Sequence, residues 1–382
     1  MIICINKFRS STILSILISF SWRFSGLDWD VEALLREVVK RRASDLHLTT
    51  GLPPMMRVDG ELQMSDYPVL RPEDTEFIAR AIVSDGGRWK QFLENHELDL
   101  SYGLAQAGRF RVNIYQQRGS YGLAIRALSY NIPSMEDLGL PQDIIQKLAV
   151  LPRGLILVTG PTGSGKSTSL ASMVDFINNT RSCHIVTVED PIEYLHSHKK
   201  CIINQRELGT DTNSFENALV HVLRQDPDVI MVGEMRNLET VAIALTAAET
   251  GHLVLATLHT NNAPQTVDRI VDIFPPYQQQ QVRIQLAGAI QGIVSQQLLP
   301  RASGKGRIPA IEIMLASNAI RNLIREGKSH QIYSVMQTSL AEGMITMDRA
   351  LFDLYRKGLV NWESVLGRAI DQKEFVFWRN RS

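Results

Sequence analysis

The nine-residue segment 160–168, GPTGSGKST, constrains this chain more than any other part of its sequence. It matches G-x-x-x-x-G-K-[ST], in which glycines let backbone N–H groups turn toward a phosphate, the lysine reaches the terminal phosphates and the hydroxyl ligates Mg²⁺. An apolar strand pattern leads into the segment and a helical pattern follows, so the helix N-terminus adds partial positive charge there. This placement favours a nucleotide-binding loop over a chance match. The predicted nucleotide-binding residues are Gly160, Pro161, Thr162, Gly163, Ser164, Gly165, Lys166, Ser167 and Thr168.

The chain of 382 residues is long enough for two domains, and its apolar pattern changes near residue 130. Helical spacing at 30–42 and 72–83, with alternating strand patterns between and after them, predicts a small α+β domain over 28–128. A linker is expected over 129–136, and 135–151 is expected to be largely helical. The predicted strands of this domain lie at 44–48, 55–58, 61–62, 97–102, 109–117 and 121–128.

In residues 137–382, short apolar runs alternate with helical segments. Continuous Val/Ile/Leu runs are typical of parallel strands whose two faces are both covered by helices. The predicted fold class is therefore α/β, with a parallel-rich sheet and C-terminal helices, and the region after Pro275 is expected to be mostly helical. The predicted strands lie at 154–159, 184–188, 229–232 and 253–257.

Composition narrows the class of protein. Forty basic and forty acidic residues give a formal net charge of zero, which argues against nucleic acid as a partner. Cys4, Cys183 and Cys201 form neither a disulfide framework nor a Cys-x-x-Cys metal pair, which favours a reduced, cytosolic compartment. The apolar run 13–22 is about half of the roughly 20 residues that a membrane-spanning helix needs. We expect residues 1–27 to be a disordered apolar extension, with a membrane tether as the alternative.

Hydrolysis also needs an oriented water and a held Mg²⁺, and three later strand ends carry suitable side chains. Glu189 and Glu234 each end an apolar strand pattern, and His259 follows LVLATL. Ligand sites in open parallel sheets lie beyond the carboxyl ends of the strands, so these three residues should meet the P-loop. Glu189 and Glu193 have an alternative role at a helix start or in salt bridges. A lone histidine is more often structural, and we expect His259 to sense the γ-phosphate rather than to transfer protons.

Four segments together resemble the ATPases of bacterial secretion systems and type IV pili. Within that family, the chain is most similar to the twitching-motility retraction motors. Their AIRNLIRE signature is matched at 319–326. Packing of an amphipathic helix would also explain that pattern. Residues 43–62 resemble the start of the family's PAS-like N-terminal domain, and the resemblance over 28–370 implies a RecA-like ATPase domain. The four segments are GPTGSGKST, VEDPIEY (188–194), LRQDPDVIMVGEMR (223–236) and ATLHTN (256–261).

The resemblance implies roles for single residues near the nucleotide. Glu234 corresponds to the catalytic glutamate that positions water, and His259 to the histidine that couples the γ-phosphate to subunit movement. Ser167 would ligate Mg²⁺. Glu189 would support the metal, directly or through a water, and would also support the attacking water. The sequence departs from the family at Asn237, where an aspartate is common, and this puts a local ion pair in doubt more than catalysis.

Two arginines complete the implied catalytic set. Arg111 in GRFRVN and Arg126 in LAIRAL match arginines that the family's N-terminal domain contributes as it swings over the nucleotide. A guanidinium suits this task because it neutralises charge on a transferring phosphoryl group. The alternative is that both are exposed strand arginines in surface ion pairs.

The resemblance implies a homo-hexamer that uses ATP and Mg²⁺ to retract type IV pili from the cytoplasm, at the inner membrane, together with a platform protein and the pilus machinery. Extension and type II secretion ATPases usually carry a four-cysteine zinc site, which three scattered cysteines cannot form. The alternatives are a related secretion-type ATPase, an accessory pilus motor, and an assembly protein that binds nucleotide without productive turnover. A RecA-like nucleic-acid motor is disfavoured by the zero net charge.

Overall fold

The computed structural model describes residues 29–58, 60–104, 108–128 and 131–381. The extension predicted for 1–27 lies outside the described residues. The chain divides into two compact units, one containing the described residues up to Leu98 with Asn113–Ile125, the other containing Asp99–Val112 and the residues from Arg126 onward. The boundaries predicted from the sequence, 28–128, 129–136 and 137–382, stay a prediction.

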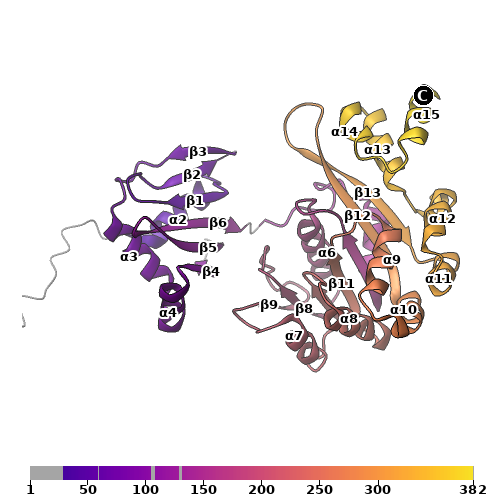
Figure 1. Ribbon diagram of the computed structural model, residues 1–382, viewed down its shortest axis with the longest axis horizontal. Helices are drawn as coiled ribbons and strands as arrows, with labels where there is room; N and C mark the ends of the chain where they lie inside the picture. The colour runs from indigo at the N-terminus through magenta and orange to yellow at the C-terminus, as the bar shows by residue number, and fades with distance from the viewer. Residues whose placement is uncertain (1–28, 59, 105–107, 129–130, 382) are drawn as a thin grey trace, which may run out of the picture. The chain divides into compact units, whose positions relative to one another are not determined.

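Six strands form the first sheet, and three helices accompany it (Figure 1). They are α2 (Val31–Lys40), β1 (Asp45–Leu48), β2 (Met55–Val58), β3 (Glu61–Met64), α3 (Pro72–Ile82), α4 (Gly86–Asn95), β4 (Glu97–Leu104), β5 (Gly108–Gln117) and β6 (Ser120–Leu128). The strand order is β3-β2-β1-β6-β5-β4, and β1, β2 and β3 pair antiparallel. The sequence pattern does not predict α4, because its first two residues are glycines, which are poor helix formers.

Seven strands form the second sheet (Figure 1). They are β7 (Gly154–Thr159), β8 (His184–Glu189), β9 (Ile202–Glu207), β10 (Val229–Val232), β11 (Leu253–Leu258), β12 (Ile290–Pro300) and β13 (Arg307–Leu315). Their order is β13-β12-β7-β11-β10-β8-β9, and every neighbouring pair is parallel except β12 and β13. The sheet is therefore parallel-rich, as the apolar runs predict, although β9 is a strand that the sequence pattern misses.

Helices pack on both faces of this sheet. They are α5 (Gln142–Ala149), α6 (Lys166–Thr180), α7 (Phe215–Val222), α8 (Leu238–Thr250), α9 (Ala263–Asp272), α10 (Pro276–Ala289), α11 (Asn318–Arg325), α12 (Ile332–Thr338), α13 (Met347–Arg356), α14 (Trp362–Leu366) and α15 (Gln372–Arg381). On β7, Leu155 and Leu157 pack into the core that contains residues of α7 to α12, whereas Ile156 and Val158 pack into the core with α5 and α6. Because successive side chains point to opposite faces, both sets must be apolar.

The region after Pro275 is mostly helical, as predicted, but it also contains two long strands, β12 and β13, that the sequence pattern does not predict. Ser295 and Gln296 interrupt the apolar pattern of β12, yet both are buried and hydrogen-bonded to other buried side chains. Buried polar residues of this kind look like surface positions in a sequence pattern. The three helices α13 to α15 pack their own apolar core against β12 and β13.

The segment 135–151 is helical only over α5, which corrects the largely helical prediction. Ser134 and Asp137 close a turn through a 2.7 Å hydrogen bond between the serine hydroxyl and the carboxylate. Gly139 then has a φ of 67°, a backbone conformation that a right-handed helix does not contain. The helix therefore begins only after Pro141.

The helix α11 holds most of the AIRNLIRE segment, and its packing follows the amphipathic pattern. Ile320 and Ile324 are fully buried on one face. From another side, the Arg321 guanidinium donates hydrogen bonds of 2.5 and 2.9 Å to the carbonyls of Ala287 and Gly288, at the C-terminal end of α10. A cation stabilises the negative end of a helix dipole, so Arg321 joins the two helices.

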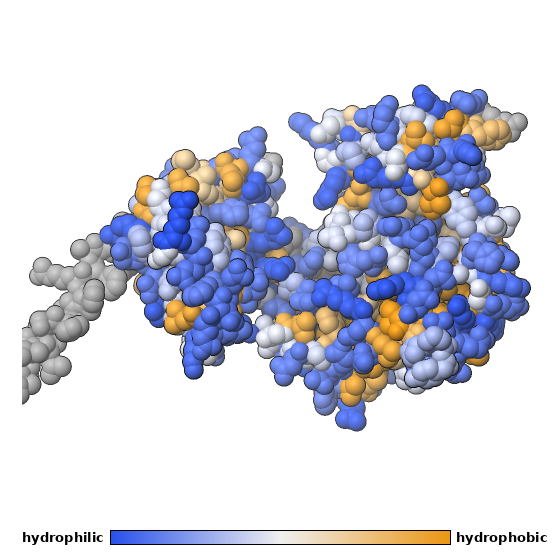
Figure 2. Space-filling model, in the orientation of Figure 1, coloured by the Kyte–Doolittle hydropathy of each residue, from blue (hydrophilic) through white to orange (hydrophobic). Residues whose placement is uncertain are grey.

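The surface view in Figure 2 shows hydrophilic residues over most of the visible face, with apolar residues in separate patches. Met64 and Ile202, which are among the most exposed large apolar side chains, belong to the edge strands β3 and β9. Single exposed apolar residues are common on folded proteins. Among the described residues, no helix has the length and apolar character that crossing a membrane requires.

Candidate nucleotide-binding site

The predicted P-loop connects the end of β7 to the start of α6 and contains three glycines with positive φ. The φ values are 143° at Gly160, 76° at Gly163 and 91° at Gly165, in the region that L side chains rarely adopt. A Cβ on Gly160 would lie only 2.2 Å from the carbonyl oxygen of Gln296. Glycine is therefore required at Gly160 by the close backbone contact and is favoured at the other two places by their positive φ. The turned backbone of the loop suits an anionic ligand.

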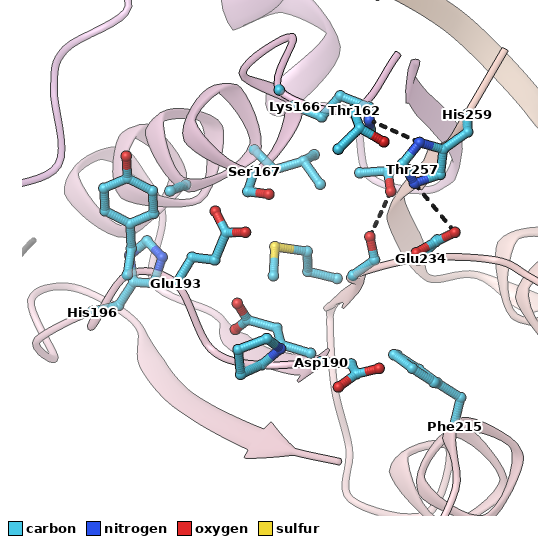
Figure 3. Close-up of a pocket in the computed structure, with 18 residues that line it drawn as sticks. Thr162, Lys166, Ser167, Asp190, Glu193, His196, Phe215, Glu234, Thr257 and His259 are labelled. Carbon is cyan, nitrogen blue, oxygen red and sulfur yellow. Dashed lines mark hydrogen bonds and ion pairs between the residues drawn. The ribbon is translucent and has the colours of Figure 1, made fainter. Parts of the chain in front are cut away.

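Lys166, the first residue of α6, is buried, and its ammonium group contacts two backbone carbonyls and a histidine ring. Its Nζ donates hydrogen bonds of 2.9 and 3.1 Å to the carbonyls of Gly160 and Pro161 and lies 3.4 Å from Nδ1 of His259 (Figure 3). Burial lowers the pKa of Lys166, and the negative charges of Glu234 and Glu193 partly oppose that effect. An ammonium held this way fits a negatively charged phosphate.

A cavity of about 180 Å³ lies beside the P-loop (Figure 3). Thr162, Gly163, Lys166 and Ser167 line one side of it. The carboxyl ends of β8, β10 and β11 supply the other side, where parallel strands place ligand-binding residues. The acidic and imidazole side chains that line it are Glu189, Asp190, Glu193, His196, Glu234 and His259. The structure thus brings the three candidates Glu189, Glu234 and His259 around one cavity with Lys166.

Glu234 follows β10 and stands at the centre of a chain of charged contacts. Its Oε1 lies 3.3 Å from Nε2 of His259, and its Oε2 lies 2.8 Å from Nη2 of Arg236. Partial burial would raise the pKa of Glu234, but the hydrogen bond and charge of Arg236, with His259 nearby, lower it below its usual range. Glu234 is therefore a carboxylate at neutral pH, ready to accept a hydrogen bond from water. Arg236 was not among the site residues predicted from the sequence, although it stands two residues after Glu234.

His259, directly after β11, connects the P-loop lysine to the candidate catalytic acid. Its two ring nitrogens face Lys166 and Glu234, respectively. The preceding strand is tied to the Glu234 turn, because Thr257 Oγ1 donates a 2.5 Å hydrogen bond to the carbonyl of Gly233. This geometry suits a group that responds to what occupies the space beside Lys166.

Glu189, at the end of β8, is the most buried acid of the cavity. Its side chain accepts hydrogen bonds of 2.6 Å from the Thr187 hydroxyl and 3.1 Å from the Gln205 amide. Burial nevertheless raises the pKa of Glu189 from an ordinary 4.5 to about 7. A buried carboxyl group whose pKa lies near 7 is strongly stabilised in its ionised form by a positive charge nearby. Glu189 therefore fits the role of supporting a metal ion.

We expect Glu189→Gln to stabilise the ligand-free protein at pH 8 but not at pH 5. The raised pKa means that the folded state holds the Glu189 proton more tightly than the unfolded state. The stability that wild-type Glu189 gains from this proton is therefore full below about pH 4.5 and is lost as the pH rises through 7. The free energy of unfolding of the variant should exceed that of the wild type by at most about 3 kcal/mol at pH 8, because a tenfold change in proton affinity is worth about 1.4 kcal/mol. Denaturant unfolding at both pH values measures this, and equal gains at pH 5 and pH 8 would contradict it.

Gln296 is a residue beside the P-loop that sequence reasoning missed. Its Nε2 donates a 2.7 Å hydrogen bond to the carbonyl of Ser164, and its Oε1 accepts one of 2.9 Å from the Ser169 hydroxyl. It lies on β12, the neighbour of β7 on the side away from β11. No local signal in the sequence pairs residue 296 with residue 164, because only the sheet brings them together.

A second cavity, of about 330 Å³, opens on this β12 side of the P-loop. Gly165 and Thr168 of the P-loop contribute to it, together with the apolar side chains of Leu138, Leu140, Leu298 and Pro309 and the guanidinium groups of Arg301 and Arg307. The P-loop therefore has a mostly acidic cavity on one side and an apolar and basic cavity on the other.

Arg111 and Arg126 do not belong to the residues that line the cavity beside Lys166. Arg111 is exposed on β5 and Arg126 is exposed on β6. Their catalytic role stays a prediction.

Asn237 replaces the aspartate that is common in the resembling family, and the structure shows what the asparagine does here. Its side-chain oxygen accepts a 3.0 Å hydrogen bond from the backbone N–H of Thr240 and so caps α8. Its amide nitrogen donates a 2.6 Å hydrogen bond to Glu216. An aspartate could cap the helix equally well, but it would face the Glu216 carboxylate without a proton to donate.

Comparison with known proteins identifies the family. The family model described as type II/IV secretion system protein matches residues 25–366. This chain belongs to that family. Among its relatives, the type IV pilus retraction ATPase PilT of Pseudomonas aeruginosa is 48% identical over 340 residues, covering 89% of this chain and 98% of PilT. The type IV pilus ATPase PilU of the same species is 44% identical over 340 residues, covering 89% of this chain and 88% of PilU.

Two solved structures share the fold of this chain. The pilus retraction motor PilT with bound ADP is 51% identical and has a TM-score of 0.84, covering 91% of this chain and 99% of that chain. The ATPase DotB of Legionella pneumophila is 26% identical with a TM-score of 0.75, covering 87% of this chain and 93% of DotB. The predicted α/β ATPase fold with a parallel-rich sheet is therefore confirmed, while the PAS-like character of the N-terminal domain stays a prediction.

Proposed function

We propose that this chain is an ATP-hydrolysing motor that drives retraction of a type IV pilus. One observation carries the proposal: Lys166 of the P-loop shares a cavity with Glu189, Glu234 and His259. The similarity to retraction ATPases over most of the chain, and the bound ADP in one solved relative, support it. The chain would work in the cytoplasm, at the inner membrane, through contacts with a platform protein and the pilus machinery.

The hydrolysis of ATP is assigned to residues around the acidic cavity. Lys166 and the turned backbone of the P-loop would hold the phosphates, and Ser167 and Glu189 would hold Mg²⁺, which neutralises phosphate charge when bound. Glu234 would orient the attacking water, since it is ionised and points into the cavity. His259 would sense the γ-phosphate through its contacts with Lys166 and Glu234.

The nucleoside end of ATP would lie in the second cavity. If the phosphates face Glu234 and His259, the rest of the molecule extends over the P-loop toward β12. Leu298 and Pro309 offer apolar contacts for a base, and Arg301 and Arg307 offer donors for the ribose or the phosphates. This arrangement would use both sides of the P-loop for one ligand.

A homo-hexamer is part of the proposal. Arg111 and Arg126 are exposed, and a movement of the N-terminal domain or a neighbouring subunit would bring them to a γ-phosphate. A ring also supports force by cycling among several sites. Native mass measurement tests this, and a strictly monomeric active enzyme would contradict it.

Arg111→Ala should leave nucleotide affinity nearly intact while turnover falls. The expected loss is roughly 10- to 100-fold, less than for a single arginine finger, because Arg126 shares the charge. Steady-state phosphate release and ADP titration measure the two quantities. Arg153→Ala, at the exposed segment before β7, is the matched control and should change neither. An unchanged turnover in Arg111→Ala would contradict the role.

A gene-deletion strain tests the cellular function. We expect cells that assemble surface pili but do not twitch, with twitching restored by the wild-type gene and not by one encoding Glu234→Gln. Cells without pili would instead indicate an assembly motor. A deletion strain that still twitches would favour the alternative of an accessory pilus motor. Purified protein that binds ATP without releasing phosphate would indicate a nucleotide-regulated assembly protein.

A further inference from the structure

A row of three buried polar side chains crosses the second sheet where β7 ends. Thr159 on β7, Ser295 on β12 and Glu312 on β13 are register partners, and all three are fully buried. The Thr159 hydroxyl donates a 2.9 Å hydrogen bond to Ser295 Oγ, and the Ser295 hydroxyl donates to the Glu312 carboxylate. Because Thr159 directly precedes Gly160, this row starts at the P-loop.

The Glu312 carboxylate also binds the first residues of two helices. Its Oε1 accepts a 2.7 Å hydrogen bond from the backbone N–H of Ala263, where α9 begins, and its Oε2 accepts one of 3.1 Å from that of Met347, where α13 begins. Helix N-termini carry unpaired N–H groups and partial positive charge, so one carboxylate satisfies both. The start of α9 is four residues after His259, and α13 is the first of the C-terminal helices.

Asp348 extends these contacts to the end of the chain. Its buried carboxylate accepts hydrogen bonds of 2.7 Å from the backbone N–H of Ile370 and 2.9 Å from that of Asp371. Asp371 in turn accepts a 3.0 Å hydrogen bond from the backbone N–H of Glu374 in the first turn of α15. Hydrogen bonds, joined by the peptide bond between Met347 and Asp348, therefore connect the P-loop strand, through Glu312, to the start of α15.

Stability alone does not account for this arrangement. A buried carboxylate carries a large desolvation cost, and apolar residues of similar size often stabilise a core as well or better. What a carboxylate offers that an apolar side chain does not is two directed acceptors, which hold two backbone segments at fixed positions relative to each other.

We propose that Glu312 is a positioning residue that couples the nucleotide site to the C-terminal helices α13 to α15. It holds the segment after His259 and the start of α13 on one side chain, so that a displacement of the first displaces the second. Glu312 acts through these segments, since it is not among the residues that line either cavity. The inference rests on the proposed function, because it assigns the His259 segment a movement during the ATPase cycle.

The variant Glu312→Gln tests the coupling, with hydrogen exchange and kinetics as readouts. Glutamine keeps the size but has one accepting oxygen, so one of the two helix starts loses its acceptor and faces an amide donor instead. In the wild type, ADP should change amide exchange both at 259–266 and at 346–372. In the variant, the first change should persist and the second should disappear. We expect kcat to fall roughly 2- to 30-fold, as for other changes in coupling networks, with ADP affinity within about twofold of wild type.

Leu351→Ala is the control for a loss of stability alone. Leu351 is fully buried in α13 and packs in the core of the C-terminal helices, so its truncation should lower Tm at least as much as Glu312→Gln. It should nevertheless keep the ADP response at 346–372. The coupling is disproved if Glu312→Gln keeps that response. It is also disproved if Leu351→Ala loses the response although its Tm equals that of Glu312→Gln.

The outcomes separate this inference from the proposed function. A wild-type protein that releases no phosphate from ATP contradicts the proposed function, while the exchange experiment with ADP still tests Glu312. A wild-type protein that hydrolyses ATP but shows no ADP-dependent exchange at 346–372 contradicts the inference alone.

Discussion

Replacing Lys166 with alanine should reduce ATP hydrolysis below detection, a loss on the order of 1,000-fold or more. The ammonium is the cation of the P-loop, and its present acceptors are two backbone carbonyls and a histidine rather than a carboxylate. The variant loses the charge that would neutralise the terminal phosphates. Nucleotide affinity should fall as well, because the same group contacts the ground state. Phosphate release and titration with ADP measure the two effects.

The fold should survive this substitution, which makes the result interpretable. Burial lowers the pKa of Lys166, so its charge is costly in the ligand-free protein, and alanine removes that cost. We expect a Tm close to that of wild type. Lys147→Ala, an exposed position on α5, is the matched control and should keep full activity. Retained turnover in Lys166→Ala would end the assignment of this loop.

Glu234→Gln should separate binding from chemistry. Glutamine occupies the same space, so ATP and ADP should still bind, but its amide is a far weaker acceptor for a proton of the attacking water. We expect turnover to fall about 1,000-fold with nucleotide affinity nearly unchanged. The variant also loses the ion pair between residue 234 and Arg236. The exposed Arg236 guanidinium keeps its ion pair with Asp190, at 3.4 Å. Single-turnover phosphate release, with binding measured in parallel, tests the prediction.

Glu239→Gln is the control for Glu234→Gln, because it makes the same chemical change five residues later on an exposed turn of α8. It should leave turnover unchanged. If Glu234→Gln turned over ATP at the wild-type rate, water would have to be oriented by another acid of the cavity, and Glu189 and Glu193 would be the next to test.

Local features of the site were predictable from the sequence. The P-loop is readable because its chemistry lies within nine consecutive residues. The strands β7, β10 and β11 are readable because burial on both faces demands apolar residues at nearly every position. Strand ends that carry Glu234 and His259 follow from the same pattern. Parallel strands place their carboxyl ends along one edge, so the approach of these residues to Lys166 needed no long-range information.

Contacts between distant strands were not predictable. Cys183 and Cys201 read as unrelated positions, yet the register of β8 and β9 places their sulfur atoms 3.3 Å apart. The strands β12 and β9 were missed because polar residues occur along them, although several of those residues are buried. A sequence pattern records which residues are polar, and only the structure shows whether a hydrogen-bond partner is available inside the fold.

The nine residues of the P-loop by themselves determined that this chain grips phosphate groups, because the glycine φ angles and the lysine spacing are local properties. Only the tertiary structure decided what supports that loop. Gln296 donates a hydrogen bond to it from a strand more than a hundred residues away. Glu312 is connected to the preceding Thr159 only through Ser295, its register partner on β12. These buried polar groups are tolerated because the sheet register supplies each with partners. Hydrogen bonds of that kind depend on pairing between strands, which residue order alone does not specify.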